Sequence, residues 1–133
     1  MKRYFLYTPR DSEAFRRFEE YLRNQPIPGR LINLPPGTGL TSTQSLEMRS
    51  NDPLVLFAAT AGEMDELLKL GEECGSYKLA LVVNDSRLVS PEVHRRLTPR
   101  LICAIAANID DLPPYLAKIL HHNPDIFQGD EPC

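Results

Sequence analysis

Short apolar segments recur along the chain at intervals that suit a repeating strand–helix unit. Strands are predicted over residues 3–7, 30–34, 53–59, 78–83 and 100–106, and the last three consist almost wholly of consecutive apolar residues. A strand that helices cover on both faces needs apolar side chains on both faces. The continuous runs therefore indicate buried strands of a parallel sheet.

Helical patterns alternate with these strands. Phe15, Phe18 and Leu22 recur at the spacing of one helix face, and Ser12 can cap a helix that runs to about Asn24. Further helices are predicted over residues 41–50 and 62–74, from Ser90 to Pro99, and from Asp110 onward. Each predicted strand is thus followed by a predicted helix.

Alternating strands and helices indicate a parallel sheet joined by right-handed crossovers, with helices on both faces. Five strands over residues 1–122 fit a flavodoxin-like, doubly wound five-stranded α/β fold with strand order 2-1-3-4-5. We expect residues 1–122 to form a single domain and the polar residues 123–133 to form a flexible tail.

Charge and cysteine content narrow the functional classes. The 133 residues carry a formal net charge of −3, which gives no general reason to expect nucleic-acid binding. No apolar run reaches the roughly 18–20 residues that cross a bilayer, and the apolar start is too short for a signal peptide. The three cysteines, Cys74, Cys103 and Cys133, are odd in number and form no CxxC pair, which favours a cytoplasmic protein. Together with the charge and the short apolar runs, this leads us to expect neither a membrane nor a nucleic-acid partner.

The spacing of the elements over residues 2–122 resembles that of response-regulator (CheY-like) receiver domains. Residues 53–57 resemble the receiver strand that leads to the phosphorylated aspartate. The resemblance implies the same doubly wound fold and a role in signalling.

The residues that receivers use for phosphorylation are missing here. Ala58 stands in place of the aspartate, Thr8-Pro9 in place of the acidic pair, and Asn84 in place of the Thr or Ser. Residues 104–108 lack the lysine that receivers place after the fifth strand. Aspartyl phosphorylation needs a nucleophilic carboxylate, carboxylates for Mg²⁺ and a balancing cation. The resemblance therefore implies a degenerate pseudo-receiver without catalysis, cofactor or metal.

Residues 34–41 resemble the phosphate-binding loop of AAA-type ATPases. Leu40 replaces the lysine that reaches the β- and γ-phosphates, and Leu34 replaces the first glycine. No acidic pair follows the third predicted strand to hold Mg²⁺. We therefore predict a flexible loop or docking surface, and leave open an anion site formed by the amides of residues 37–43.

The carboxyl ends of the strands form the expected ligand crevice of a doubly wound sheet. The candidate ligand-binding residues there are Thr8, Asp11, Thr60, Asn84, Asp85, Ser86 and Asn108. They can form hydrogen bonds but include few nucleophile–base pairs. The same residue types also form turns and helix caps, and this alternative stays open.

No catalytic or metal-ligating set is predicted. His94, His121 and His122 lack the spacing of metal ligands, and no GxSxG, HExxH or dinucleotide-binding motif is present.

Receivers commonly signal or dimerise through the fourth helix, fifth strand and fifth helix, which match the region from Ser90 to His122. The candidate interaction residues there are Arg95, Arg96, Arg100, Asp110, Asp111 and Tyr115. The basic and acidic groups could complement each other across a two-fold axis. We therefore predict a non-catalytic signalling or regulatory module that binds a protein partner or itself. The alternative is a small-ligand-binding or enzymatic domain that uses the crevice.

Overall fold

The computed structural model describes residues 3–37, 52–71 and 78–122. The helix predicted over residues 41–50, the end of the one predicted over 62–74, and the tail over 123–133 lie outside these ranges.

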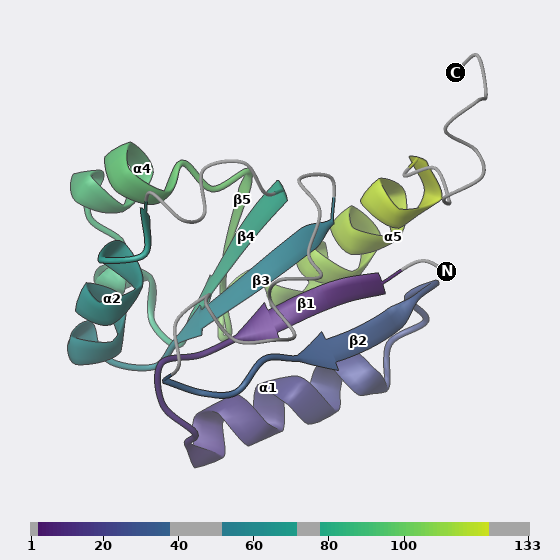
Figure 1. The fold of residues 1–133 in the computed structure, drawn as a ribbon, viewed down its shortest axis with the longest axis horizontal. Coiled ribbons are helices and arrows are strands. Elements are labelled where there is room, and N and C mark those ends of the chain that lie inside the picture. Colours follow the sequence, from purple (N-terminus) through teal and green to yellow (C-terminus); the bar gives the residue numbers. More distant parts are fainter. Residues whose placement is uncertain (1–2, 38–51, 72–77, 123–133) are drawn as a thin grey trace.

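Five parallel strands form one sheet in the order β2-β1-β3-β4-β5, as predicted for a flavodoxin-like α/β fold (Figure 1). The strands are β1 (Arg3–Tyr7), β2 (Arg30–Asn33), β3 (Pro53–Ala58), β4 (Lys78–Val83) and β5 (Leu101–Ala104). The order reverses direction beside β1, because the chain passes first to β2 on one side and then to β3 on the other.

The fifth strand is shorter than predicted. Its apolar run continues to Ala106, but the N–H groups of Ala107 and Asn108 both donate to the Ala104 carbonyl, at 3.0 and 3.1 Å. These bonds turn the chain before the run ends. Hydrophobicity alone overestimated this strand because a turn interrupts its apolar sequence.

The described helices are α1 (Glu13–Arg23), α2 (Ala61–Leu68), α4 (Pro91–Leu97) and α5 (Leu112–His122), with short 3₁₀ turns η2 (Ser86–Leu88) and η3 (Ile109–Asp111). The continuous helix predicted over residues 62–74 is wrong, because α2 gives way to a turn after Leu68. There the Leu70 N–H donates to the Leu67 carbonyl at 2.9 Å.

The sequence explains how α1 forms and packs. The Ser12 hydroxyl accepts a hydrogen bond from the Phe15 N–H at 3.1 Å and caps the helix start. Phe15, Phe18 and Leu22 are buried against the sheet. The Phe18 ring stacks on Phe57 of β3, with 5.2 Å between ring centroids. Burying each such side chain stabilises the fold by about 1.5–3 kcal/mol.

Helices cover both faces of the sheet, and each face has its own core (Figure 1). The core under α2 and α4 includes Leu54, Leu56, Leu67, Leu81 and Leu97. The core under α1 and α5 includes Leu6, Phe18, Phe57, Leu116 and Leu120. The strands supply side chains to both cores, which is why their sequences are continuously apolar.

The two edges of the sheet differ in polarity. Edge strand β2 carries Arg30 and Asn33, and the Asn33 side-chain amide donates to Glu19 of α1. Edge strand β5 contains only uncharged residues, and its Leu101 and Ile102 are half-buried.

In the described part of the chain, none of the helices is both long enough and apolar enough to span a bilayer.

Candidate functional site

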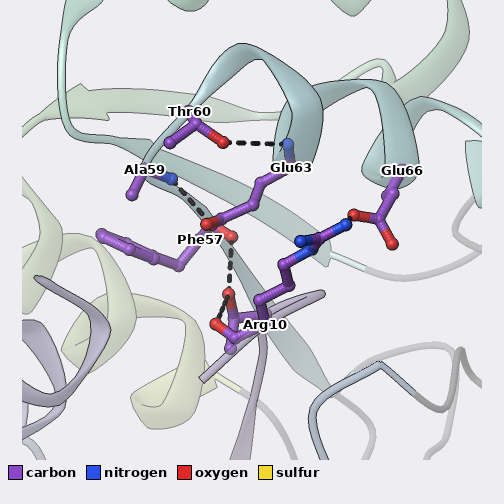
Figure 2. Close-up of polar contacts among 7 residues, drawn as sticks. Arg10, Phe57, Ala59, Thr60, Glu63 and Glu66 are labelled. Atoms are coloured by element: carbon purple, nitrogen blue, oxygen red, sulfur yellow. Dashed lines mark hydrogen bonds and ion pairs between the residues drawn. The ribbon is translucent and has the colours of Figure 1, made fainter. Parts of the chain in front are cut away.

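The predicted crevice lies where β1 and β3 end side by side. This is the switch point of the sheet, where ligands bind in many doubly wound folds. The loop after β1 contributes Thr8 and Arg10, and β3 leads through Ala58 into the start of α2. Figure 2 shows Arg10 beside the start of α2.

Thr8 joins the two strand ends. Its side chain is fully buried, and its hydroxyl oxygen lies 3.2 Å from both the Phe57 and the Arg10 carbonyl oxygens. The Thr8 carbonyl accepts a hydrogen bond from the Gly37 N–H at 3.2 Å. The hydroxyl and carbonyl groups of Thr8 are therefore bonded within the protein.

Gly37 begins the glycine-containing part of the loop that resembles a phosphate-binding loop. Its φ of 78° lies in the left-handed region, and a Cβ there would lie 3.0 Å from the Pro9 carbonyl oxygen. The described start of this loop thus packs on the loop after β1. The remainder of the proposed amide cradle lies outside the described residues.

Thr60 and Glu63 cap α2. The Thr60 hydroxyl accepts from the Glu63 N–H at 3.2 Å, and the Glu63 carboxylate accepts from the Ala59 N–H at 3.0 Å (Figure 2). Glu63 is only 5% exposed. Glu63 is not among the residues predicted from the sequence, although the Thr60-x-x-Glu63 spacing is that of a capping box.

Arg10 and Glu66 form an ion pair beside this cap, with 3.2 Å between Arg10 Nε and a Glu66 carboxylate oxygen (Figure 2). It links the loop after β1 to α2. Both side chains are well exposed, so the pair adds little stability. No local pattern marks it, because the two residues are 56 positions apart.

Beyond β4, Asp85 caps η2 and binds Arg87. Its carboxylate accepts from the Arg87 N–H at 2.9 Å and from the guanidinium at 2.7 Å. Hydrogen bonds from the Arg87 side chain and then its backbone lower the pKa of Asp85 to about 2. Asn84 and Ser86 are exposed on either side, and the Asn84 N–H donates to the Ala58 carbonyl at 3.1 Å.

The two outermost crevice residues also bind nearby groups. Asp11 forms two hydrogen bonds with Arg16 of α1, at 3.1 and 3.2 Å. The Asn108 side chain accepts from the Ala104 N–H at 2.8 Å and donates to the Ile102 carbonyl at 3.1 Å. The structure brings Thr8 and Thr60 to adjacent strand ends. Asp11 lies just before α1, and the other candidates follow β4 and β5. Their binding of a ligand stays a prediction.

The two carboxylates among the candidate crevice residues, Asp11 and Asp85, each bind an arginine. Ala58, at the end of β3, is fully buried within the core. Burial, and then the nearby Asp111 carboxylate, raise the pKa of the Cys103 thiol to about 11, which disfavours the reactive thiolate. No group of three potential metal ligands occurs within residues 3–37, 52–71 and 78–122.

The predicted interaction residues divide between two faces. Arg95 and Arg96 are exposed on α4, whereas Tyr115 is half-buried on α5 across the edge strand β5. The hydroxyl of Tyr115 is buried without a hydrogen-bond partner. Burial raises the pKa of Tyr115, and Arg100 partly opposes this.

The two acidic residues of this surface sit in η3. Asp111 is exposed, while Asp110 accepts a hydrogen bond of 2.8 Å from the Tyr21 hydroxyl of α1. Burial, and then this bond, raise the pKa of Tyr21 to about 12. Asp110 is therefore engaged with α1, on the face opposite α4.

A cavity of about 670 Å³ lies away from the crevice, between the ends of α2 and α4. Its described lining consists of Leu68, Lys69, Gly71, Arg95 and Arg96. The sequence showed the Arg95–Arg96 cluster but not its approach to Lys69, because that approach depends on helix packing.

Comparison with protein-family models, curated proteins and solved structures gives no match to this chain.

Proposed function

We propose that this chain is a non-catalytic, receiver-like signalling or regulatory module that acts by protein–protein contact and is not phosphorylated on aspartate. The main support for this proposal is the residue at position 58, which is alanine. The methyl group of Ala58 is fully buried in the core at the end of β3, where a receiver would present its aspartate. Alanine offers no oxygen to accept a phosphoryl group.

The contacts around Ala58 support the same function. Thr8 bonds to the end of β3, and Glu63 caps the backbone of the following loop. Arg10, the nearby cation, is paired with Glu66. These hydrogen bonds and this ion pair stabilise local structure, and the groups that form them need no bound reactant as a partner.

The edge strand β5 and its flanking helices supply the proposed contact surface. Leu101 and Ile102 offer partly exposed apolar area, and the exposed Arg100 lies directly before them. An apolar centre with a charged rim is typical of protein interfaces. Two copies related by a two-fold axis would place Arg100 of one near the acidic η3 of the other.

A phosphoryl-analogue titration tests the absence of phosphorylation. With Mg²⁺ and BeF₃⁻ or acetyl phosphate, we expect the amide NMR spectrum of the full chain to stay unchanged. A known active receiver, titrated in parallel, controls for the reagent. Saturable shifts around Ala58 and Asn84 would contradict the proposal and favour the ligand-binding alternative.

Sedimentation equilibrium tests self-association through β5. We expect a concentration-dependent dimer that Arg100→Glu weakens and that mixing Arg100→Glu with Asp111→Arg partly restores. Arg17→Glu, at an exposed position on α1, is the matched charge control and should leave the dimer intact. A wild-type chain that stays monomeric, or equal weakening by both arginine variants, rules out this self-association.

A further inference from the structure

The groove between α2 and α4 is distinct from the crevice. The two helices lie side by side on one face of the sheet (Figure 1). Each helix starts near a strand carboxyl end and runs back toward the amino ends. The cavity is lined by Leu68, Lys69 and Gly71 after α2 and by Arg95 and Arg96 late in α4, so it lies toward the amino ends of the strands.

Cationic side chains from both helices line this groove. Glu92 is the carboxylate that contacts both arginines, at 2.9 Å from Arg96 and 3.9 Å from Arg95. Lys69 adds a third cation to the lining. Among the described residues, three cations therefore meet one contacting carboxylate at this groove.

The backbone beneath these side chains is fixed by packing. A Cβ at Gly71 would lie 2.7 Å from the Arg96 carbonyl oxygen, so only glycine allows the two segments to come this close. Val93 and Leu97 anchor α4 in the core. Thr98 then ends α4 in the left-handed region at φ 45°, an uncommon conformation for a β-branched residue.

We propose that this groove binds a small oligophosphate anion. Guanidinium groups bind phosphate oxygens through paired, charge-assisted hydrogen bonds, and Lys69 adds a point charge from the opposite helix. The cavity of about 670 Å³ lies in the usual range for small-molecule sites. Neighbouring phosphate groups of such an anion would contact cations that come from two helices. Arg100 and β5 do not line the cavity, although α4 contributes both to the cavity and to the proposed protein interface.

Pyrophosphate is the probe for this site. Calorimetry and amide NMR on the full chain, at constant ionic strength set with sodium chloride, should show saturable binding. The largest shifts should fall on Lys69, Gly71, Arg95 and Arg96. Absence of saturation, or shifts centred on Thr8 and Asn84, would overturn the proposal.

Two matched arginine variants separate a local site from general charge. Arg96→Gln should weaken pyrophosphate binding by about tenfold or more, because it removes a charge-assisted contact. Arg17→Gln makes the same change in net charge and also breaks a helical (i, i+4) pair, Arg17–Glu13 at 2.7 Å, but away from the groove. It should change the affinity by less than about twofold. Equal loss in both variants would mean diffuse attraction and no site.

Glu92→Gln gives a test in the opposite direction, which also serves if Arg96→Gln fails to fold. Removing the carboxylate that competes for both guanidiniums should tighten pyrophosphate binding by about threefold or more. Glu13→Gln, the matched change on α1, should have little effect. If Glu92→Gln binds no more tightly than Glu13→Gln, the proposal is wrong.

Discussion

The carboxyl ends of the strands and the α2–α4 groove use their polar side chains in opposite ways. At the carboxyl ends, Thr8, Glu63 and Asp85 bind backbone or neighbouring groups. In the groove, Lys69, Arg95 and Arg96 meet a single described carboxylate. The fold class predicts a ligand at the carboxyl ends of the strands, whereas the cluster of cations lies in the α2–α4 groove.

The difference has a physical cause. Every helix that follows a strand starts with N–H groups that lack helical acceptors. Thr, Ser, Asp and Asn at the strand ends satisfy those groups, and they are also the residue types that bind ligands. Residue type at a strand end therefore cannot separate a cap from a binding site, whereas hydrogen-bond partners can.

The largest expected effect comes from placing an acidic residue at position 58. Ala58→Asp would place a carboxylate in an apolar, fully buried site, and should lower the free energy of unfolding by about 3–5 kcal/mol. Urea denaturation measures the change. Ala59→Asp, one residue later and half-buried, should cost less than half as much. An Ala58→Asp protein of wild-type stability that binds Mg²⁺ would show that the crevice is open.

Glu63 gives the next largest effect. Glu63→Ala should lower the free energy of unfolding by about 1–2 kcal/mol, because the Ala59 N–H loses its acceptor. Glu63→Gln keeps an acceptor oxygen and should recover most of the loss in the same denaturation experiment. A Gln variant as unstable as the Ala variant would mean that charge, and not capping, is what Glu63 contributes.

The Tyr21–Asp110 bond should contribute about 1 kcal/mol at neutral pH. The folded-state pKa of Tyr21 is raised from 10.0 to about 12, so its contribution is complete below pH 10. It is lost as the pH rises from 10 to about 12. In thermal unfolding, the melting temperature of the wild type should exceed that of Tyr21→Phe, and the difference should narrow between pH 10 and about 12. A margin that does not change with pH would contradict the assigned bond.

Arg87→Gln should have the smallest effect on stability. The Asp85–Arg87 pair is exposed, so the melting temperature at neutral pH should change by no more than about 1 °C. The pKa of Asp85, followed by carboxyl-carbon NMR, should rise from about 2 toward 3.8. Any stabilisation of the fold that follows from this lowered pKa is complete above pH 3.8 and is lost as the pH falls through about 2. An unchanged Asp85 pKa would remove Arg87 as its cause.

Sequence predicted the architecture well because burial on both faces leaves a continuous apolar signal. The strand order and the position of every strand in the sheet are confirmed. Boundaries were less accurate where a turn interrupts an apolar or amphipathic run, as after Ala104 and Leu68.

The candidate sites were less predictable. Thr60-x-x-Glu63 is a local pattern that could have been found in the sequence. The Arg10–Glu66 pair and the approach of Gly71 to Arg96 join residues that only the tertiary fold brings together. No spacing rule along a single chain encodes such contacts.

The close approach of Gly71 to Arg96 sets different tolerances for the shape and the charge of the groove. Any side chain at position 71 would have to push the end of α4 away from α2. Arg95, by contrast, projects into solvent with 71% of its side chain exposed, so its replacement need not disturb the backbone. Substitutions at Arg95, whether natural or engineered, can therefore change the charge of the groove while the backbone that shapes it stays the same.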